Sequence, residues 1–469
     1  MGAITATRPP DGLRSLVEKY DVYIPRFEVF VGPRESTSET ASEAELIGVK
    51  DVLGQELDRI ERQIARPTSE ENQAESATFV PLAGPLDSEK PETRVVRSVS
   101  FTESVGPEAE LSQVQLEIHN VYDPQRQRYE YTDTVGDAPP LLDYGKVIVL
   151  RIGYRDGVET VFEGIIVQIT ADFPADGEPT VSVTAVDKRE KLRAARPENR
   201  EAFREHTVEE VAARLVALGH LRLGEGTERA PLGGRVRVPR DQDLSEFLVD
   251  LARRGARELS AFGNAVLMLK PGDEAEPVLT YRYREGLISF SPVFNATGCP
   301  VEVDVRARTP NGTRIRGHAD IDDLQREGMV PPATAGESAL QELESAGRPR
   351  RERVERVSNL VFENASEANQ YARALLKYHL DRLLTASGEL MGDPRVRAGR
   401  SIAIEGVGRY NGCYYLTSVV HSIGDSGYQT SFDARRNTRL TAQESSSASE
   451  QSEPASTNAG NGATAEAAP

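Results

Sequence analysis

The residues whose types could support chemistry are few and lie far apart in the chain. Glu163 and Asp187 are the best candidates for a pair of acids, the arrangement used in general acid and base catalysis. Each lies within a β pattern, however, so turn and interface contacts explain both better than catalysis does. His318, Asp320, Asp322 and Asp323 combine ligand types that suit a divalent cation. An acidic turn or helix start accounts for these residues more simply.

The remaining reactive side chains also favour structural roles. His421 lies between apolar residues of an expected strand, which favours a core or interface histidine over a general base. Cys299 and Cys413 are too few and too far apart for a disulfide scaffold or a zinc site. The chain has no nucleophile elbow, no H-E-x-x-H, no Walker loop and no G-x-G-x-x-G after a strand. We therefore expect no catalytic site, no cofactor and no metal, and a protein that is not an enzyme.

Composition bounds the class of protein. The 469 residues carry a net charge of -18 and are 38% hydrophobic, and no run of eighteen apolar residues predicts a membrane span. Such a charge argues against nucleic-acid binding, although residues 35–92 hold fourteen acids and five bases, and residues 441–469 hold four acids and no base. The N-terminus lacks the pattern of a secretory signal. We expect synthesis in the cytoplasm and release by lysis inside a larger assembly.

The first β region is expected over residues 20–190. It begins with a strand over 21–32 and continues, after a low-complexity insertion over 33–92, with five strand-length segments between Thr93 and Arg189. Composition predicts disorder in the insertion, apart from an amphipathic helix within Ser42–Ala65 that could dock on the fold.

From residue 191 to 283 the apolar period changes to that of a small α/β module. A capping box at Thr207 and Glu210 predicts one helix, and Asp243 with Glu246 predicts a second. A second β region follows over 284–440, with a hairpin at Asn311-Gly312, an exposed loop over 325–352 and a helix over 366–386. Residues 441–469 read as a disordered tail.

Gly392–Asn437 predicts three short strands, with turns at Asn411-Gly412 and at Gly424–Gly427. Their order and spacing parallel Tyr144–Arg189, where a glycine-led strand, an aromatic-led strand and an alternating strand also follow one another. We expect a mainly β protein with α+β parts, in which two related β-barrel domains flank the α/β module.

Several motifs resemble the late control protein D family, the hub proteins of contractile phage tails and related injection systems. They are "LRIGYRDGVETVFEGIIVQI", "SVTAVDKREKL", "DQDLSEFLVDLARRGA", "GDPRVRAG", "YYLTSVVHSI" and "GYQTSFDARRN", which together span roughly residues 93–440. The hub part of valine-glycine repeat spike proteins is similar. Unlike those spikes, this chain shows no OB-fold or β-helix after the hub part, and it has no lysozyme-like segment.

The resemblance implies a structural role at the baseplate. A homotrimer with two tube-type barrels per chain would present a pseudo-six-fold ring to the hexameric inner tube, seat a separate spike protein, contact other baseplate proteins and transmit contraction. The alternatives are the tail-tip hub of a non-contractile phage tail and an envelope-degrading enzyme carried by the tail. A free soluble binding protein also remains open.

The residues expected to form turns, fill the barrels or lie at subunit contacts come from both copies of the repeat. They are Gly153, Tyr154, Phe162, Glu163, Gly164, Asp187, Gly392, Asp393, Gly399, Gly406, Gly412, Tyr414, Tyr415, Thr417, Tyr428, Phe432, Arg435, Arg436 and Asn437.

Overall fold

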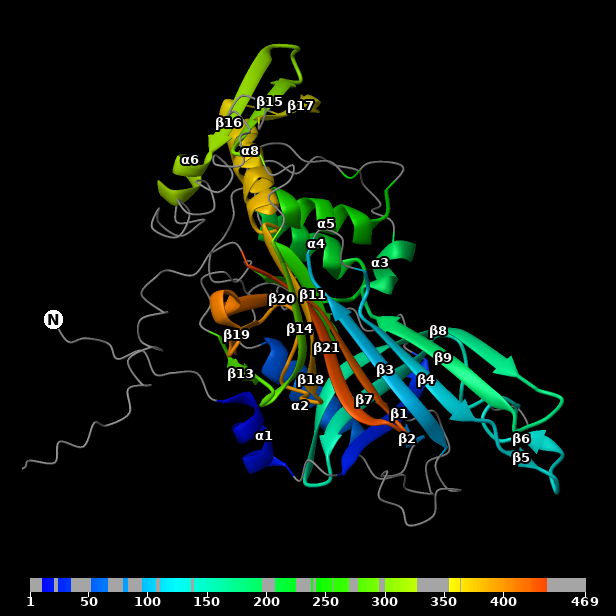
Figure 1. Cartoon of the computed structure of the whole chain (residues 1–469). Helices are drawn as coiled ribbons and strands as arrows, with labels where there is room; N and C mark the ends of the chain where they lie inside the picture. The colour runs from blue at the N-terminus through cyan, green and yellow to red at the C-terminus, as the bar shows by residue number, and fades with distance from the viewer. Residues whose placement is uncertain are drawn as a thin grey trace, which may run out of the picture.

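The computed structural model describes residues 11–20, 24–34, 52–65, 79–82, 95–106, 110–135, 139–195, 207–224, 238, 242–255, 257–269, 277–294, 300–326, 354–362 and 364–436. The fold is mostly β (Figure 1). A 13-stranded sheet runs through most of the described chain, and two small α/β units lie beyond one end of it. No helix among the described residues is long and apolar enough to cross a bilayer.

Six strands near the C-terminal end form a closed barrel. Its members are β13 (Leu279–Tyr283), β14 (Gly286–Phe294), β18 (Leu384–Met391), β19 (Ser401–Glu405), β20 (Gly412–Gly424) and β21 (Gly427–Arg436). The ring closes because β19 pairs with β13 on one side and with β20 on the other. Apolar side chains of alternating residues fill it, among them Leu287, Ile402, Leu416 and Phe432. We call this unit barrel 2.

The N-terminal strands curl around a second core, which we call barrel 1. In sheet order they are β3 (Val96–Ser104), β4 (Gln113–His119), β9 (Thr180–Asp187), β8 (Gly157–Asp172), β7 (Lys146–Tyr154), β1 (Pro25–Arg34) and β2 (Val80–Pro81). Phe27 of β1 and Phe101 of β3 lie in one apolar cluster, so side-chain packing brings the two ends of the curl together. A small hairpin, β5 (Tyr122–Asp123) and β6 (Arg128–Tyr129), projects from this barrel.

Two α/β units lie above the barrels in Figure 1. The middle module contains α3 (Glu190–Ala194), α4 (Val208–Ala217), α5 (Leu244–Arg254), β10 (Arg222–Leu223), β11 (Glu258–Phe262) and β12 (Ala265–Leu269). The distal module contains β15 (Glu302–Arg308), β16 (Arg314–Asp320), α6 (Ile321–Arg326), β17 (Val354–Val361) and α8 (Ala365–Leu380). Each module has an apolar core of its own.

Helix caps predicted from sequence are present in both modules. Thr207 and Glu210 form the full capping box of α4, and the Asp243 side chain accepts from the Glu246 backbone N–H at the start of α5. The helix predicted over 366–386 is α8, but it ends at Leu380, because Leu384 and the residues after it pair as β18 in barrel 2. In the sequence, the apolar spacing of the helix continues into the first residues of β18, so the end of the helix could not be located from that spacing.

Two expectations about domain membership differ from the observed pairing. Leu279–Tyr283, within the range 191–283 expected for the middle module, is β13, which closes barrel 2. The strands around Asn311-Gly312, placed by sequence in the second β region, form the separate sheet β16-β15-β17 of the distal module. Strand patterns identify strands, but they do not identify the sheet that a strand joins.

The internal repeat is confirmed by strand pairing. Barrel 1 has the antiparallel order β3-β4-β9-β8-β7, and barrel 2 has the antiparallel order β14-β18-β21-β20-β19. The ladders also break at matching places. The register shifts between Val96 and Ser98 in β3 and between Leu287 and Ser289 in β14. It shifts between Ile166 and Gln168 in β8 and between Leu416 and Ser418 in β20.

Local details repeat with the ladders. Gly145 and Gly399, at equivalent positions before β7 and β19, have φ of 80° and 82°. Their N–H groups donate over 2.9 Å to the equivalent carbonyls of Ile166 and Leu416. Only glycine adopts this φ without strain. In addition, Ser98 Oγ lies 3.3 Å from Glu117 Oε2, and Ser289 Oγ lies 3.3 Å from Glu389 Oε2, on equivalent strands.

One predicted turn is wrong. Asn411 has φ of -56° and Gly412 is the first residue of β20, so the two do not form a two-residue hairpin. The connection instead uses Gly406 and Gly408, both at positive φ, and a 3-10 turn, η4 (Gly408–Tyr410). The predicted turns at Gly424–Gly427 and at Gly312 are confirmed.

Two helices pack against the barrels from outside. Helix α1 (Gly12–Lys19), which sequence analysis did not predict, is tied to barrel 2 where Arg395 donates to the Gly12 carbonyl and to Ser15 Oγ, both over 3.0 Å. Helix α2 (Val52–Ile64) is the docking helix expected in the insertion, and residues 42–51 of that expectation lie outside the described residues.

Candidate functional site: the barrel seam and the strand edges

The two barrels are fused by one antiparallel ladder between β20 and β3. It runs from Ser418 opposite Ser104 to Ile423 opposite Val99. At its centre Phe101 and His421 are direct partners, and their rings stack at a centroid distance of 5.9 Å with an interplanar angle of 9°. This seam sets the position of one copy of the repeat relative to the other.

His421 is a buried, neutral histidine of the seam. Its Nε2 lies 3.0 Å from the Val396 carbonyl, and its Nδ1 lies 2.9 Å from the Tyr428 hydroxyl and 3.1 Å from Thr430 Oγ1. A neutral ring with its proton on Nε2 donates to the Val396 carbonyl and leaves the single lone pair of Nδ1 to accept from a neighbouring hydroxyl. Burial, reinforced by the nearby Arg397 charge, lowers the pKa of His421 from 6.5 to about 3. The expectation of a satisfied core or interface histidine is therefore confirmed.

A bidentate ion pair crosses the seam beside His421. Arg397 of barrel 2 donates from Nε to Glu103 Oε2 over 2.8 Å and from Nη2 to Glu103 Oε1 over 2.9 Å. Arg397 also donates to the Val161 carbonyl and lies over the Phe101 ring. Burial opposes its charge, but the Glu103 carboxylate outweighs that effect, so the pKa of Arg397 is raised. The fork geometry holds the barrels in one orientation.

Tyrosines form a further contact between the two barrels. The buried Tyr154 hydroxyl of barrel 1 donates over 2.6 Å to the Gly392 carbonyl of barrel 2. Its ring lies 5.6 Å from that of Tyr428 and 5.7 Å from that of Tyr20. A Cβ at Gly392 would overlap the Tyr428 ring, which explains the glycine. Desolvation raises the pKa of Tyr154 well above its usual value, so the hydroxyl stays a donor.

Glu163 is buried in an ion network rather than free for catalysis. Its Oε1 lies 2.9 Å from Lys188 Nζ, and its Oε2 pairs with Arg59 of α2. Arg59 also pairs with Glu56, which in turn accepts from the Asn264 backbone N–H over 3.2 Å. Burial opposes the charge of Glu163, but the two cations outweigh it, so the pKa of Glu163 is lowered. The network anchors α2 to barrel 1 and to the middle module.

Asp187 has a structural role that recurs elsewhere in the chain. It accepts from the Ser112 N–H over 2.6 Å, from the Arg189 N–H over 2.9 Å and from the Arg189 guanidinium. Asp393 accepts from the Arg395 N–H and guanidinium in the same Asp-X-Arg pattern, and Tyr281 donates to it. Each aspartate fixes the chain where it leaves a barrel strand.

The remaining predicted residues fall into three groups. Gly153, Gly164, Phe162, Tyr414 and Phe432 lie where the strands pack closely or where the cores are filled. Gly399, Gly406 and Gly412 have positive φ, and Thr417 occupies the β20 bulge. Tyr415 and Arg435 both contact Glu258 over 2.6 Å, Arg436 donates to the Asn411 carbonyl, and Asn437 lies outside the described residues.

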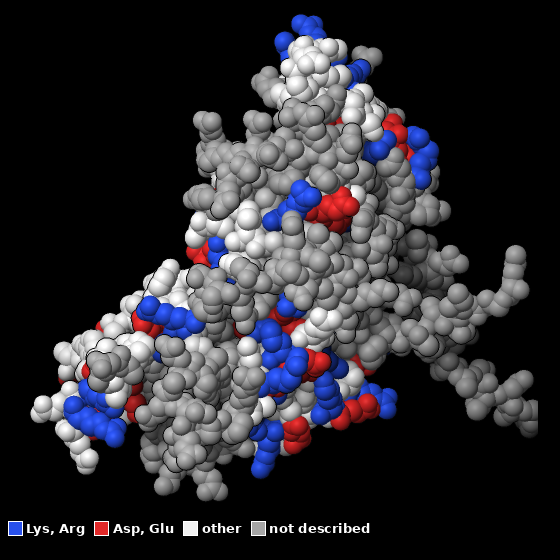
Figure 2. Space-filling model, turned by 180° about the vertical axis from the view of Figure 1, so that it is seen from behind, with Lys and Arg blue, Asp and Glu red and all other residues white. Residues whose placement is uncertain are grey.

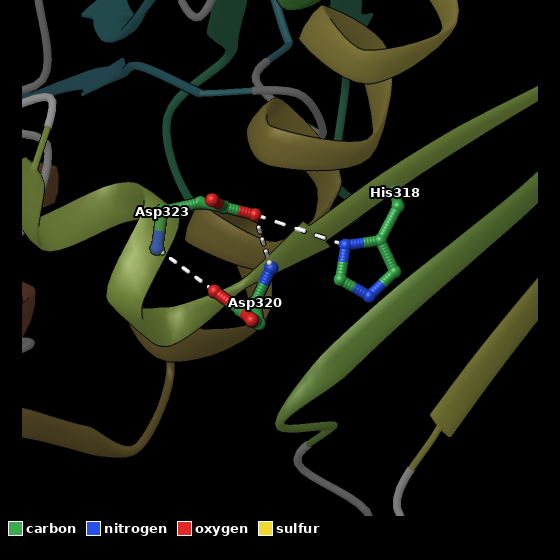
Figure 3. A group of neighbouring side chains, drawn as sticks. All are labelled: His318, Asp320 and Asp323. Carbon is green, nitrogen blue, oxygen red and sulfur yellow. Dashed lines mark hydrogen bonds and ion pairs between the residues drawn. The ribbon is translucent and has the colours of Figure 1, made fainter.

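The possible cation ligands around His318 form the start of α6, as the simpler explanation predicted (Figure 3). The Asp323 N–H donates to Asp320 Oδ1 over 2.8 Å, and the Asp320 N–H donates to Asp323 Oδ2 over 3.1 Å. Asp323 also pairs with Arg326, and His318 Nδ1 lies 3.8 Å from Asp323 Oδ2. These carboxylates are engaged in a reciprocal helix cap, which explains the cluster without an ion.

Sequence analysis missed the arginines that tie barrel 2 to β3 and to α1. Arg397 and Arg395 lie inside the quoted motif "GDPRVRAG", but their partners Glu103 and Gly12 are almost 300 and almost 400 residues away in the chain. The available signal was two arginines in a glycine-rich segment between strands. No spacing rule identifies partners so distant.

Each barrel also carries a strand edge without a partner among the described residues. In barrel 2, β14 pairs with β13 only at its first two residues and with β18 on its other side, which leaves one edge of Ser289–Val293 without a strand partner among the described residues. In barrel 1, β8 pairs with β7 only up to Ile165, which leaves the edge from Val167 to Asp172 open. Val293 of β14 and Phe173, directly after β8, are 56% and 55% exposed.

Comparison with known proteins identifies the family to which the chain belongs. A family model described as the Alg8 N-terminal domain matches residues 122–425, about two thirds of the chain. The chain belongs to this family. No curated protein matches it. The match to the Alg8 N-terminal domain covers the seam ladder on the β20 side and all of barrel 2 up to β20.

Solved structures show how widely the fold of this Alg8 N-terminal domain family member is shared. The 43 kDa tail protein of prophage MuSo2 from Shewanella oneidensis is similar with a TM-score of 0.54 and 13% identity, over 73% of this chain and 95% of that chain. The tail protein from Neisseria meningitidis MC58 is similar with a TM-score of 0.52 and 13% identity, over 73% and 93%. The chain has the fold of these tail proteins.

Proposed function

We propose that this protein is a structural hub of a contractile injection particle or phage tail, in which three copies form a ring between an inner tube and a separate spike. Two tail proteins with the same fold support the tail context. The duplicated barrel supports the ring, because a chain with two equivalent units can repeat its internal contact with another copy. The candidate acids Glu163 and Asp187 are both engaged in buried contacts, which supports a role without catalysis.

The open strand edges carry this proposal. Within one chain, β20 of barrel 2 pairs with β3 of barrel 1. The repeat makes β8 equivalent to β20, and β14 equivalent to β3. Both of these equivalents have open edges among the described residues. An exposed strand edge is a template for pairing with another chain, so β8 of one copy fits β14 of the next as β20 fits β3.

The repeat also predicts the register of that contact. At the seam, Val420 lies opposite Thr102. When the two repeats are aligned by their bulges, Thr170 is equivalent to Val420 and Val293 is equivalent to Thr102. Thr170 should therefore lie opposite Val293 of the next copy. By the same equivalence the exposed Phe173 should face Phe290, a partly buried residue at the margin of the barrel 2 core. The contact is head to tail, and three copies would provide the six barrels of a pseudo-six-fold ring.

Cysteine cross-linking tests this register directly. In a Thr170→Cys/Val293→Cys variant, the directly opposite residues have Cα atoms about 5 Å apart, a separation that a disulfide between copies bridges under mild oxidation. We expect covalent dimers and trimers on a non-reducing gel, and a mass of three chains by native mass spectrometry. The wild type, with Cys299 and Cys413 alone, measures the background.

A matched variant moves one cysteine out of register. Ser289 shares the strand and face of Val293 but lies about 13 Å along it, so Thr170→Cys/Ser289→Cys should give only background cross-linking. Equal cross-linking of both pairs, or a monomeric mass at high concentration, would contradict the proposed contact.

The position in the particle needs a separate measurement. Images of the native particle with the protein labelled should place three-fold density between tube and spike, in contact with other baseplate proteins. A sheath around the tube distinguishes the contractile form from the tail-tip hub of a non-contractile phage tail. Density elsewhere in the particle would refute the hub assignment even if the trimer forms.

A further inference from the structure

Five arginines cover one face of the distal module. On the sheet β16-β15-β17 the side chains of Arg306, Arg308, Arg314, Arg316 and Arg356 are all exposed. We call this surface the arginine face. It lies on a module that projects away from both barrels, and basic side chains gather at that end of the molecule (Figure 2). The surface is unusual in a chain whose net charge is -18.

The opposite face of the same sheet is packed. Val303 and Val305 of β15 lie in the apolar cluster of the module, and a Cβ at Gly317 would overlap the Ala368 backbone of α8. Because side chains alternate along a strand, the arginines point away from α8. The core of the module therefore does not require them.

The register of the sheet places like charges directly opposite one another. Arg306 faces Arg316, and Arg308 faces Arg314, across the β15–β16 ladder. Such pairs destabilise a sheet. Asp304 compensates in part, since it lies 2.6 Å from Arg316 Nε and 3.6 Å from Arg306 Nε. Arg308, Arg314 and Arg356 form no ion pair with another described residue. Like charges that the fold compensates only in part are typical of a binding surface.

We propose that the arginine face binds an acidic segment of a partner protein. Guanidinium groups form forked hydrogen bonds with carboxylates, and three of these arginines lack an acidic partner among the described residues. The surface lies outside the barrels, so this proposal does not depend on the ring.

Two features favour a protein segment over nucleic acid. The far end of the same sheet carries Glu302 and Asp320, paired in register, so the face changes sign along its length. A polyphosphate backbone is negative throughout and would be repelled there, whereas a short peptide can place its carboxylates over the arginines alone. The overall negative charge of the chain also opposes the approach of a long polyanion. Salt screens charges more than about 10 Å apart, so a short acidic peptide on the arginine face still interacts with the arginines it contacts.

Fluorescence anisotropy of the full chain with a labelled ten-residue peptide, in which four consecutive glutamates are flanked by neutral residues, tests the proposal. We expect the wild type to bind it with an affinity that falls as salt rises. The Arg308→Gln/Arg314→Gln variant should bind about tenfold more weakly, the loss expected for two exposed charged contacts. The same variant should unfold at an equal or higher temperature, because one like-charge pair is gone.

Arg14→Gln/Arg126→Gln is the matched control, since these arginines are also exposed but lie outside the arginine face. It should bind the peptide as the wild type does. Equal loss of binding in this control, unchanged binding by the Arg308→Gln/Arg314→Gln variant, or no binding by the wild type would overturn the proposal. Binding of a 20-base-pair DNA as tightly as the peptide would overturn the choice of a protein segment.

Discussion

The seam histidine makes the stability of this protein depend on pH in a predictable direction. Burial lowers the pKa of His421 from 6.5 to about 3 in the folded chain, while the unfolded chain keeps the ordinary value. Between about pH 3 and pH 6.5, His421 binds a proton in the unfolded state but not in the folded state. The free energy of unfolding therefore has its full His421 contribution above pH 6.5 and loses it as the pH falls toward 3.

The size of this effect follows from the shift. At pH 5 the unfolded histidine is protonated and the folded one is not, which costs about 2 kcal/mol relative to pH 7. The charged groups nearest the ring are Arg397, which opposes protonation, and its partner Glu103. Urea unfolding at pH 7 and pH 5, compared between the wild type and His421→Gln, isolates the contribution, because carboxylates titrate in both proteins.

We expect the wild type to lose about 2 kcal/mol more than His421→Gln between the two pH values. The exposed His220 offers a matched control, and His220→Asn should keep the wild-type difference. If His421→Gln does not fold, NMR titration of the labelled wild type still tests the prediction, since the buried ring should remain neutral at pH 5. A protonated His421 in the folded protein at pH 5 would refute the reasoning.

Two further substitutions test contacts near the end of barrel 2. Gly412→Val forces a β-branched residue into positive φ and displaces the Arg436 guanidinium, so we expect the free energy of unfolding in urea to fall by about 3 kcal/mol. Gly427→Ala, at positive φ in open space, should lower it by only about 1 kcal/mol. Equal losses in the two variants would refute the steric argument. Arg435→Met leaves Glu258 buried without its cation and should lower stability by about 4 kcal/mol. Adding Glu258→Gln should recover part of that loss, and no recovery would show that the buried charge is not the cause.

Strands and helix caps could be predicted from the sequence because each depends on residues close together in the chain. Val181, Val183 and Ala185 alternate with polar neighbours along β9, the alternating strand predicted within Tyr144–Arg189, and Thr207 with Glu210 predicted the start of α4. The repeat was legible as well, since three strands in one order recur at similar spacing. Helix α8 shows the limit, because its apolar stripe continues smoothly into residues that pair as β18.

By itself, then, the sequence determined a mainly β chain with two copies of a β unit, capped helices between them and no catalytic constellation. Only the tertiary structure decided which strand pairs with which, since alternation assigns side chains to a face but names no partner. The seam between β3 and β20, the neutral state of His421 and the open edges of β8 and β14 all depend on pairings between distant segments. The arginine face was also hidden, because Arg306 and Arg316 become neighbours only when β15 and β16 align.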